Sequence, residues 1–333
     1  MKKYLILGVV LLFTFTLTIV HASGEKVSVD SGVIKYYTDN DESELDAFAS
    51  AIAKGTGLKL EPLRLSSGEA WARVDAEAPN VGADIHFGWP LSFAIMAKQK
   101  GLLLQYKSPE WYAIASQYKD PEGYWYGWSY WFACIGVNTK LIEEKGYAKP
   151  RSWKDLLDPK WKGEIVMPNP GTSGTAFLTV STIMQLLGEE EGWRYLEKLS
   201  ANVAQYTKSG SAPGQLVAQG EYMVGITWDQ AIQKRRDEGY PIELIIPEEG
   251  TGYVLDIAVI YKNTKNTESV KKFIDYIGSK EFHEVVSQYR SKVTYPGVEA
   301  LVKFDPKLIN YDAQWAADNR ERIMSTWKER FGQ

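Results

Sequence analysis

Four short segments combine small hydroxyl-bearing residues, glycine and aspartate, and residues of these types can bind an anion or a polar solute. They are Thr38-Asp39-Asn40, Ser66-Ser67-Gly68, Gly171-Thr172-Ser173-Gly174-Thr175 and Ser209-Gly210-Ser211. Each stands between an expected strand and an expected helix, where free backbone N–H groups and the helix dipole favour negative charge. Ordinary helix capping explains any single segment equally well. Four such segments facing one cleft predict a binding site.

Aromatic residues supply the second set of candidates. Residues 123–132, "GYWYGWSYWF", hold seven aromatic side chains in ten positions, and strand alternation places Ser129 and Trp131 on one face. Trp89, Trp131 and Trp228 stand near strand ends, where flat rings suit sugar faces or cationic groups, although each also suits a lobe core. Asp229, beside Trp228, is a candidate orienting acceptor.

Catalytic motifs are scarce. Only His86 and His283 follow residue 22, and the sequence contains no Walker loop, no Gly-x-Ser-x-Gly elbow and no His-Glu-x-x-His motif. Glu248 and Glu249 could serve glycoside hydrolysis, but Gly250 beside them favours a solvated turn. The sequence therefore favours a binding protein without cofactor or metal over a secreted hydrolase.

The beginning of the chain reads as a secretory signal peptide over residues 1–22. Lys2 and Lys3 precede an apolar run that ends at Val20-His21-Ala22, although a membrane anchor is an alternative reading. Without this segment 36 Lys and Arg (38 minus two) face 42 Asp and Glu, which excludes a generally basic nucleic-acid surface. The single cysteine, Cys134, allows no disulfide framework, and no cysteine stands at the cleavage site to carry a lipid.

Alternating strand and helix patterns must position these residues. The patterns predict strands over 32–38, 58–65 and 83–89, with helices from Glu42 to Gly55 and over 68–78. A second group has strands over 163–170, 203–207 and 222–228 and helices over 173–188 and 212–221. A terminal helix presents an apolar stripe of Ala316, Ile323, Met324, Trp327 and Phe331. In such α/β sheets ligands bind beyond the carboxyl ends of the strands, and this chain length favours two lobes.

Longer motifs carry a family resemblance. The runs "DPEGYW", "GVNTKLI", "PRSWKDLLDPKWKGEIVMPNPGTSGTAF", "GWRYLEKLSANVAQYTKSGSAPGQLVAQGEYMVGI" and "PEEGTGY" resemble solute-binding proteins of bacterial ABC importers, in the branch of ferric-iron, hexose-phosphate and phosphonate binders. The resemblance implies a type 2 periplasmic-binding-protein fold, with two α/β lobes joined by two hinge crossings around a ligand cleft. It implies crossings near Val137-Asn138 and Ile257-Ala258. Lobe one would span 23–137 and 258–333 with the C-terminal helix, and lobe two 138–257.

The ligand residues depart from the family patterns. The tyrosine pair of ferric binders is replaced by Trp228-Asp229-Gln230, and the matching first-lobe positions are Asp41 and Trp89. The His-Asp pair of sugar-phosphate binders is also missing, and Val254 replaces the glutamate that follows "GTGY", a motif that ends with the candidate Tyr253. Because the phosphate-style segments remain, we expect a small organic anion held by helix N-termini and aromatic rings. If Asp229 and Asp256 both face the cleft, a cationic amine or thiamine-like ligand is an alternative, as is ferric iron.

The resemblance also implies a cellular role. The protein would capture a small-molecule solute and deliver it to the permease subunits of an ABC importer. We expect a periplasmic monomer that binds no nucleic acid and catalyses no reaction. The residues expected to bind the solute are Thr38, Asp39, Ser67, Gly68, Trp89, Ser129, Trp131, Thr172, Ser173, Gly174, Thr175, Ser209, Gly210, Ser211, Trp228, Asp229 and Tyr253.

Overall fold

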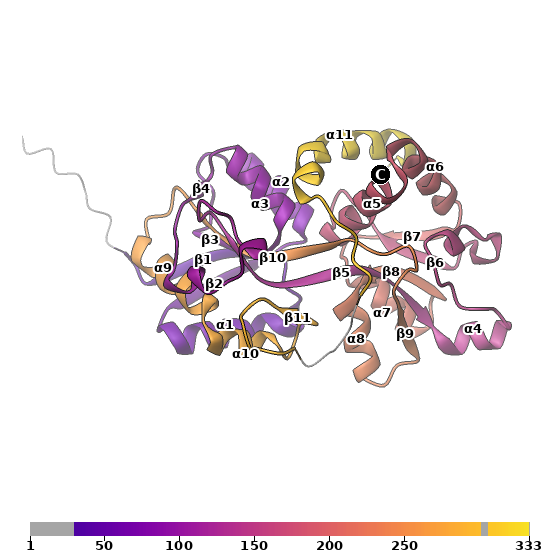
Figure 1. The fold of residues 1–333 in the computed structure, drawn as a ribbon, viewed down its shortest axis with the longest axis horizontal. Coiled ribbons are helices and arrows are strands. Elements are labelled where there is room, and N and C mark those ends of the chain that lie inside the picture. Colours follow the sequence, from indigo (N-terminus) through magenta and orange to yellow (C-terminus); the bar gives the residue numbers. More distant parts are fainter. Residues whose placement is uncertain (1–29, 301–305, 333) are drawn as a thin grey trace, which may run out of the picture.

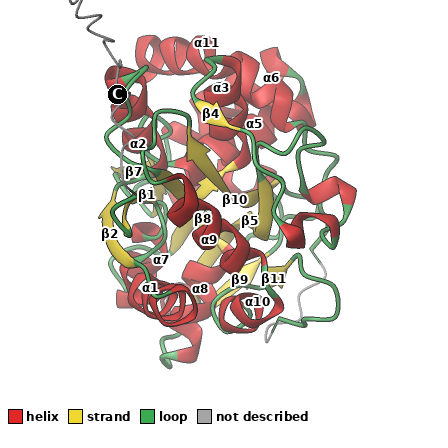
Figure 2. Cartoon of the chain, turned by 90° about the vertical axis from the view of Figure 1, so that its left-hand side faces the viewer, coloured by secondary structure: helices red, strands yellow, loops and turns green. Residues whose placement is uncertain are grey.

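The computed structural model describes residues 30–300 and 306–332, so the predicted signal peptide lies outside the described residues. Figure 1 shows two α/β lobes side by side, with strands β5 (Tyr126–Asn138) and β10 (Tyr253–Tyr261) running between them. The view in Figure 2 shows strands in the middle and helices on both sides of them. This arrangement confirms the predicted fold class. Within the described ranges no helix is both long and apolar enough to cross a membrane.

The first lobe, as named here, surrounds the strands that pair with β10. Its elements are β1 (Val33–Thr38), β2 (Lys59–Arg64), β3 (Ile85–Pro90), β4 (Leu103–Leu104), β11 (Lys292–Val293), α1 (Glu42–Thr56), α2 (Ser67–Glu77), α3 (Leu91–Gln99), α9 (Thr267–Gly278), α10 (Lys280–Val286) and the short helices η1 (Pro109–Tyr112) and η2 (Ser116–Tyr118). β1 pairs in parallel with β2 and β3, whereas β10 is antiparallel to β3. The carboxyl ends of β1, β2 and β3 therefore point towards one edge of the lobe.

The second lobe repeats the pattern around β6 and β8. Its elements are β6 (Ile165–Pro168), β7 (Val203–Thr207), β8 (Val224–Trp228), β9 (Ile242–Ile245), α4 (Thr139–Lys145), α5 (Gly174–Leu187), α6 (Glu189–Ser200), α7 (Ala212–Gln219), α8 (Asp229–Asp237) and the short helices η3 (Lys154–Leu157) and η4 (Pro159–Trp161). β6 pairs in parallel with β7 and β8. Across both lobes the strand order is β2-β1-β3-β10-β5-β8-β6-β7.

Helix α1 shows how the local sequence produces these elements. It begins at Asp41, which forms a capping box with Glu44, and buries Phe48 and Ile52 at helical spacing. Its C-cap is Gly57, in the left-handed conformation with φ of 73°. The predicted end at Gly55 was therefore two residues early, since a helix-ending glycine is marked by this conformation rather than by glycine alone.

The lobes meet where β5 changes its pairing partner. Residues up to Phe132 pair with β10, and residues from Ala133 onwards pair with β8. The return crossing lies beside this point, because the Thr251 hydroxyl donates to the Ala133 carbonyl oxygen at 2.6 Å. These positions precede the crossings expected near Val137 and Ile257, and the residue boundaries of the lobes stay a prediction.

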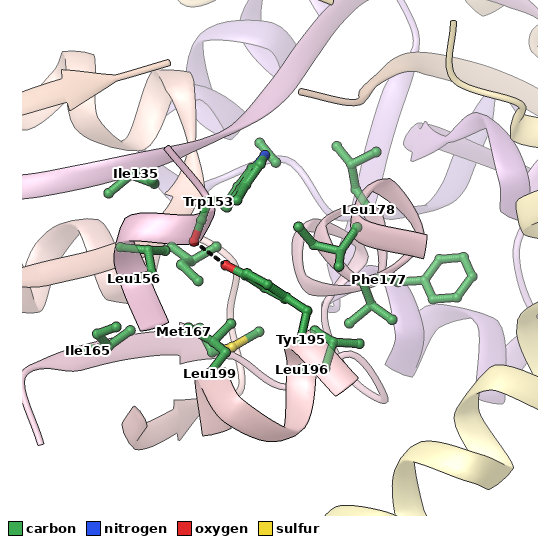
Figure 3. Close-up of a cluster of buried hydrophobic side chains, with 14 of the residues drawn as sticks. Ile135, Trp153, Leu156, Ile165, Met167, Phe177, Leu178, Tyr195, Leu196 and Leu199 are labelled. Atoms are coloured by element: carbon green, nitrogen blue, oxygen red, sulfur yellow. Dashed lines mark hydrogen bonds between the residues drawn. The ribbon is translucent and has the colours of Figure 1, made fainter. Parts of the chain in front are cut away.

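Each lobe has its own hydrophobic core. In the first lobe Trp128 stacks on Phe87, with ring centroids 4.9 Å apart, so this ring of the aromatic-rich segment belongs to the core. Figure 3 shows a core of the second lobe, in which Trp153 and Tyr195 lie among aliphatic side chains. The Tyr195 hydroxyl donates to the Trp153 carbonyl oxygen at 2.6 Å, which satisfies the polar atom of a buried ring.

The C-terminal helix α11 (Ala313–Phe331) lies over α5 and α6 (Figure 1). Its apolar stripe, predicted from the sequence, packs into the second-lobe core through Ala316, Ile323 and Trp327. The resemblance grouped this helix with the first lobe, whereas the structure seats most of its stripe on the second. It also touches the first lobe, because Gln99 at the end of α3 donates to Asp318 at 2.7 Å.

Candidate functional site

A cleft between the lobes is lined mainly by residues at the starts of helices. The first lobe contributes Asp39, Asn40, Asp41, Glu44, Arg64, Ser66, Ser67, Gly88, Asp256 and Arg290, the middle of β5 contributes Trp131, and the second lobe contributes Ser173, Gly174, Thr175, Ser209, Gly210, Ser211 and Trp228. About 450 Å³ of space lies between these atoms, part of it open to solvent, and about 50 Å³ of it can hold the centres of water-sized molecules. The smaller volume is far below the roughly 300–1,000 Å³ of typical small-molecule sites, so the cleft is narrow in this conformation.

Ten of the seventeen residues predicted from the sequence line this cleft. They are Asp39, Ser67, Trp131, Ser173, Gly174, Thr175, Ser209, Gly210, Ser211 and Trp228. The two tryptophans meet edge to face, with ring centroids 5.7 Å apart. Both rings are more than nine-tenths buried, so they form a wall of the cleft rather than an exposed platform.

The other seven predicted residues lie outside the cleft lining. Trp89 is fully buried and stacks on His86 with ring centroids 4.1 Å apart. Ser129 is buried beneath the cleft, where it donates to Asp256 at 2.7 Å. The Thr38 hydroxyl accepts from a neighbouring backbone amide, and Gly68 and Thr172 hydrogen-bond to each other between the lobes. Asp229 is fully buried, and Tyr253 packs against Tyr130.

Direct contacts hold the two lobes together across the cleft. The Gly68 amide donates to the Thr172 carbonyl oxygen at 2.9 Å. The Ser211 hydroxyl donates to Asp41 Oδ2 at 2.6 Å, and Ser211 Oγ in turn accepts from Trp228 Nε1 at 3.0 Å. The Gly68–Thr172 and Asp41–Ser211 bonds join opposite lobes, so these two bonds exist only while the lobes are in contact.

Arg290 organises the floor of the cleft. Its guanidinium is buried and ion-pairs with Glu44 of α1 and with Asp256 of β10, the latter at 3.0 Å. The same group lies over the Trp228 ring, 5.2 Å from its centroid, so it also contacts the second lobe. Trp131 Nε1 donates to the other oxygen of Asp256 at 2.8 Å. The Asp256 carboxylate is thus fully engaged by protein donors.

Asp39 has a different environment. Its Oδ2 accepts from the Ser67 hydroxyl, whereas its buried Oδ1 has no hydrogen-bond partner among the described residues. Burial raises the pKa of the Asp39 carboxyl well above its usual range, and the charge on Asp256 raises it further, against the opposing Ser67 bond. Asp39, a residue of the cleft lining, therefore keeps one carboxyl oxygen without a partner among the described residues.

Asp229 begins α8 but does not reach the cleft. Its side chain is fully buried and accepts from the Phe132 amide at 3.2 Å, at the point where β5 passes between the lobes. Burial raises the pKa of its carboxyl to about 6, against the opposing hydrogen bonds. This geometry gives Asp229 a structural position at the crossing.

The raised pKa predicts how Asp229 affects stability. As the pH rises from 3.8 to about 6, the folded chain keeps a proton that the unfolded chain releases, so stability falls over this interval. Asp229→Asn should retain the acceptor for Phe132 and raise the free energy of unfolding at neutral pH by up to about 3 kcal/mol. Urea unfolding at several pH values measures this effect. Asp237→Asn, at the exposed end of α8, is the control and should change stability by less than about 0.5 kcal/mol.

Eight lining residues were not among the predicted site residues. They are Asn40, Asp41, Glu44, Arg64, Ser66, Gly88, Asp256 and Arg290. Arg64 ends β2, and Asn40, Asp41 and Ser66 belong to the same strand-to-helix junctions as predicted residues, so the strand-end rule could have found them. Arg290 follows α10, away from any such junction, and no local pattern marks it.

Comparisons with known proteins agree with this architecture. The family model described as "Bacterial extracellular solute-binding protein" matches residues 83–315. An uncharacterized protein of Haemophilus influenzae is 35% identical over 81% of this chain and 82% of its own length. A Sinorhizobium fredii protein named as an ABC transporter periplasmic-binding protein, y4fP, is 27% identical over 78% of this chain and 73% of its own length.

Solved structures show the same fold. The periplasmic binding protein AfuA of Actinobacillus pleuropneumoniae, described with bound fructose-6-phosphate, has a TM-score of 0.86 and 31% identity, over 90% of this chain and 98% of AfuA. Iron-bound HitA of Pseudomonas aeruginosa has a TM-score of 0.76 over 88% of this chain and 98% of HitA, but at 19% identity it supports the fold alone. The chain belongs to the bacterial extracellular solute-binding proteins and is a periplasmic solute-binding component of an ABC transporter.

Proposed function

We propose that the cleft binds a small organic anion bearing a phosphate or phosphonate group, that the lobes close around it, and that the closed protein delivers it to the permease. The main support is the convergence of two hydroxyl-rich helix starts from the second lobe, Ser173 to Thr175 and Ser209 to Ser211, on one cleft. The bound ligand of AfuA, a sugar phosphate, agrees with this chemistry. No described residues form a cluster suited to a metal ion, and the cleft contributes no tyrosine, which disfavours ferric iron as the solute.

The start of α5 offers donors for an anion. The Ser173 side chain caps the helix by accepting from the Ala176 amide at 3.4 Å. Gly174 and Thr175 occupy the first turn, where amides have no partner within the helix and the dipole is positive. Gly174 adds no side chain that would keep an anion away from the backbone. Ser67 and Pro90 of the first lobe lie against Gly174 in this conformation, so an oxyanion would approach these amides and the Thr175 hydroxyl when the lobes are apart.

The ion pairs of the cleft favour anion binding by backbone amides and hydroxyls over anion binding by an arginine side chain. Arg290 is engaged by Glu44 and Asp256, and Arg64 pairs with Asp41 at 3.1 Å. With two positive charges, these pairs engage three of the four cleft carboxylates, so those carboxylates have little hydrogen-bonding capacity left for a cationic solute. The anion would then be held by neutral donors and helix dipoles.

Isothermal titration against fructose-6-phosphate, fructose, putrescine and ferric citrate tests the proposal. We expect heat of binding from fructose-6-phosphate and none from unphosphorylated fructose. Tight binding of putrescine or ferric citrate, without binding of any phosphorylated or phosphonate-bearing compound, would refute it. Chemical conversion of the bound compound would show a hydrolase instead.

Thr175→Val provides a finer test, because valine keeps the shape of threonine and removes its hydroxyl. The lost hydrogen bond should weaken fructose-6-phosphate binding by roughly 3- to 10-fold in isothermal titration. Thr179→Val, one turn further along α5, removes a buried hydroxyl that donates to the Thr175 carbonyl oxygen inside the helix at 3.0 Å. This control should leave the affinity unchanged, and an equal effect of both substitutions would argue against a phosphate at the helix start.

A further inference from the structure

The carboxylates of the cleft differ in whether protein donors already satisfy them. Asp41 accepts from Arg64 at 3.1 Å and from Ser211 at 2.6 Å. Glu44 accepts from Arg290 through both oxygens. These two side chains, like Asp256, have donors from the protein on each carboxylate oxygen. They are therefore parts of the wall, and a solute gains little from them.

Asp39 is the exception in this set. It stands at the carboxyl end of β1, and only its Oδ2 is engaged, by Ser67 at the start of α2. Its Oδ1 is buried and has no partner within the part of the chain that the structure describes. An unpaired buried acceptor costs free energy that a ligand donor can recover.

The position of this acceptor relates it to the anion site. Ser67, the partner of Asp39, lies against the start of α5, since a Cβ built on Gly174 would be 2.7 Å from Ser67 Oγ. The acceptor on the first lobe and the donors on the second lobe thus line the same narrow space. A solute that spans this space meets donors at one end and an acceptor at the other.

We propose that Asp39 is a specificity-determining residue that selects anionic solutes carrying an O–H or N–H donor away from the phosphate or phosphonate group. This inference rests on the proposed function and narrows its solute class to hydroxylated or amino-bearing phosphates and phosphonates. A solute with an anionic group and an apolar remainder would leave Asp39 Oδ1 unpaired, and the cleft discriminates against it.

The protonation of Asp39 supplies an independent signature. Asp256 of β10 and Arg64 of β2 are the charged groups that act on it, in opposite directions, and burial keeps its pKa high. A ligand donor favours the ionised carboxylate, so binding should release a proton. Titrations in two buffers of different ionisation enthalpy measure this release.

The experiment compares three probes in the wild-type protein and in Asp39→Ala. Fructose-6-phosphate carries hydroxyl donors, 2-aminoethylphosphonate carries an ammonium donor, and phenyl phosphate carries no donor outside its phosphate. We expect the wild type to prefer at least one donor-bearing probe over phenyl phosphate by roughly 10- to 100-fold. Asp39→Ala should remove this preference and the proton release, and should leave phenyl phosphate binding within about 3-fold. The probe that is preferred identifies the donor as hydroxyl or ammonium.

Two results would overturn the inference alone. One is phenyl phosphate binding to the wild type as tightly as the donor-bearing probes, and the other is an equal loss of all probes in Asp39→Ala with a retained melting temperature. If Asp39→Ala does not fold, Asp39→Asn replaces it, and an unchanged preference together with unchanged proton release contradicts the inference. Failure of every phosphate and phosphonate to bind the folded wild type would instead refute the proposed function.

Discussion

Gly68→Ala is expected to weaken binding of fructose-6-phosphate by roughly 10- to 100-fold without destabilising the fold. A Cβ at this position would lie 2.9 Å from both the carbonyl carbon and the oxygen of Thr172, and closer still to the carbonyl oxygen of Gly171. These are backbone atoms of the opposite lobe, which cannot rotate away as a side chain can. The methyl group should therefore keep the lobes apart and remove the bonds that depend on their contact.

The stability of the Gly68 variant separates closure from folding. Gly68 lies inside α2, without an unusual backbone conformation, where alanine is favoured over glycine by roughly 0.5–1 kcal/mol. The melting temperature should stay the same or rise. Isothermal titration measures the affinity, and small-angle X-ray scattering measures the lobe separation.

Gly174→Ala is a milder variant for comparison, because its Cβ would meet the side chains of Ser67 and Pro90, which can adjust. Unchanged affinity and compactness in Gly68→Ala would contradict the role of this contact.

Arg290→Met is expected to lower the free energy of unfolding by roughly 3–5 kcal/mol, because it leaves Glu44 and Asp256 buried without their common cation. The carboxylates can relieve this cost by taking up protons, so the deficit should shrink at acidic pH. Urea unfolding followed by tryptophan fluorescence at neutral and acidic pH measures both effects. Arg64→Met is the matched control, since its ion pair with Asp41 is partly exposed and should contribute at most about 1 kcal/mol.

A triple substitution tests the explanation for this loss. Adding Glu44→Gln and Asp256→Asn to Arg290→Met removes the buried negative charges together with the cation. Stability should then recover in part, because the dominant cost of the single change is an uncompensated buried charge. If the triple variant is less stable than Arg290→Met, lost packing rather than charge explains the effect.

Much of the fold follows from local sequence patterns. Period-two and period-3.6 patterns located the strands and helices that hold the four hydroxyl-rich segments, and the strand-end rule brought most of those segments to one cleft. Trp89 shows where the strand-end rule fails. Gly88 before it has φ of 95°, and the pairing of β3 with β10 shifts register beside it. The bulge turns the indole towards His86 and Phe93 inside the first lobe.

Arg290 shows why the rest of the site could not be predicted. It is separated from its partner Glu44 by 246 positions in the sequence, and the contact depends on how α10 packs beside α1. Neither periodicity nor a motif encodes that packing. Asp256, by contrast, was considered as a cleft residue from the sequence. The hydrogen bonds that its carboxylate accepts from Trp131, Ser129 and Arg290 depend on the same long-range arrangement.

Helix α11 touches both lobes at a seam outside the cleft lining. Arg320 of this helix lies between the rings of Phe93 in the first lobe and Phe177 in the second, 4.8 Å and 4.7 Å from their centroids. A rotation of the lobes would change the surroundings of this seam. The solute itself would not contact the seam, because the seam lies outside the cleft lining. An environment-sensitive fluorophore attached at Asp318 would therefore report solute capture optically, which makes the C-terminal helix a natural attachment point for a biosensor.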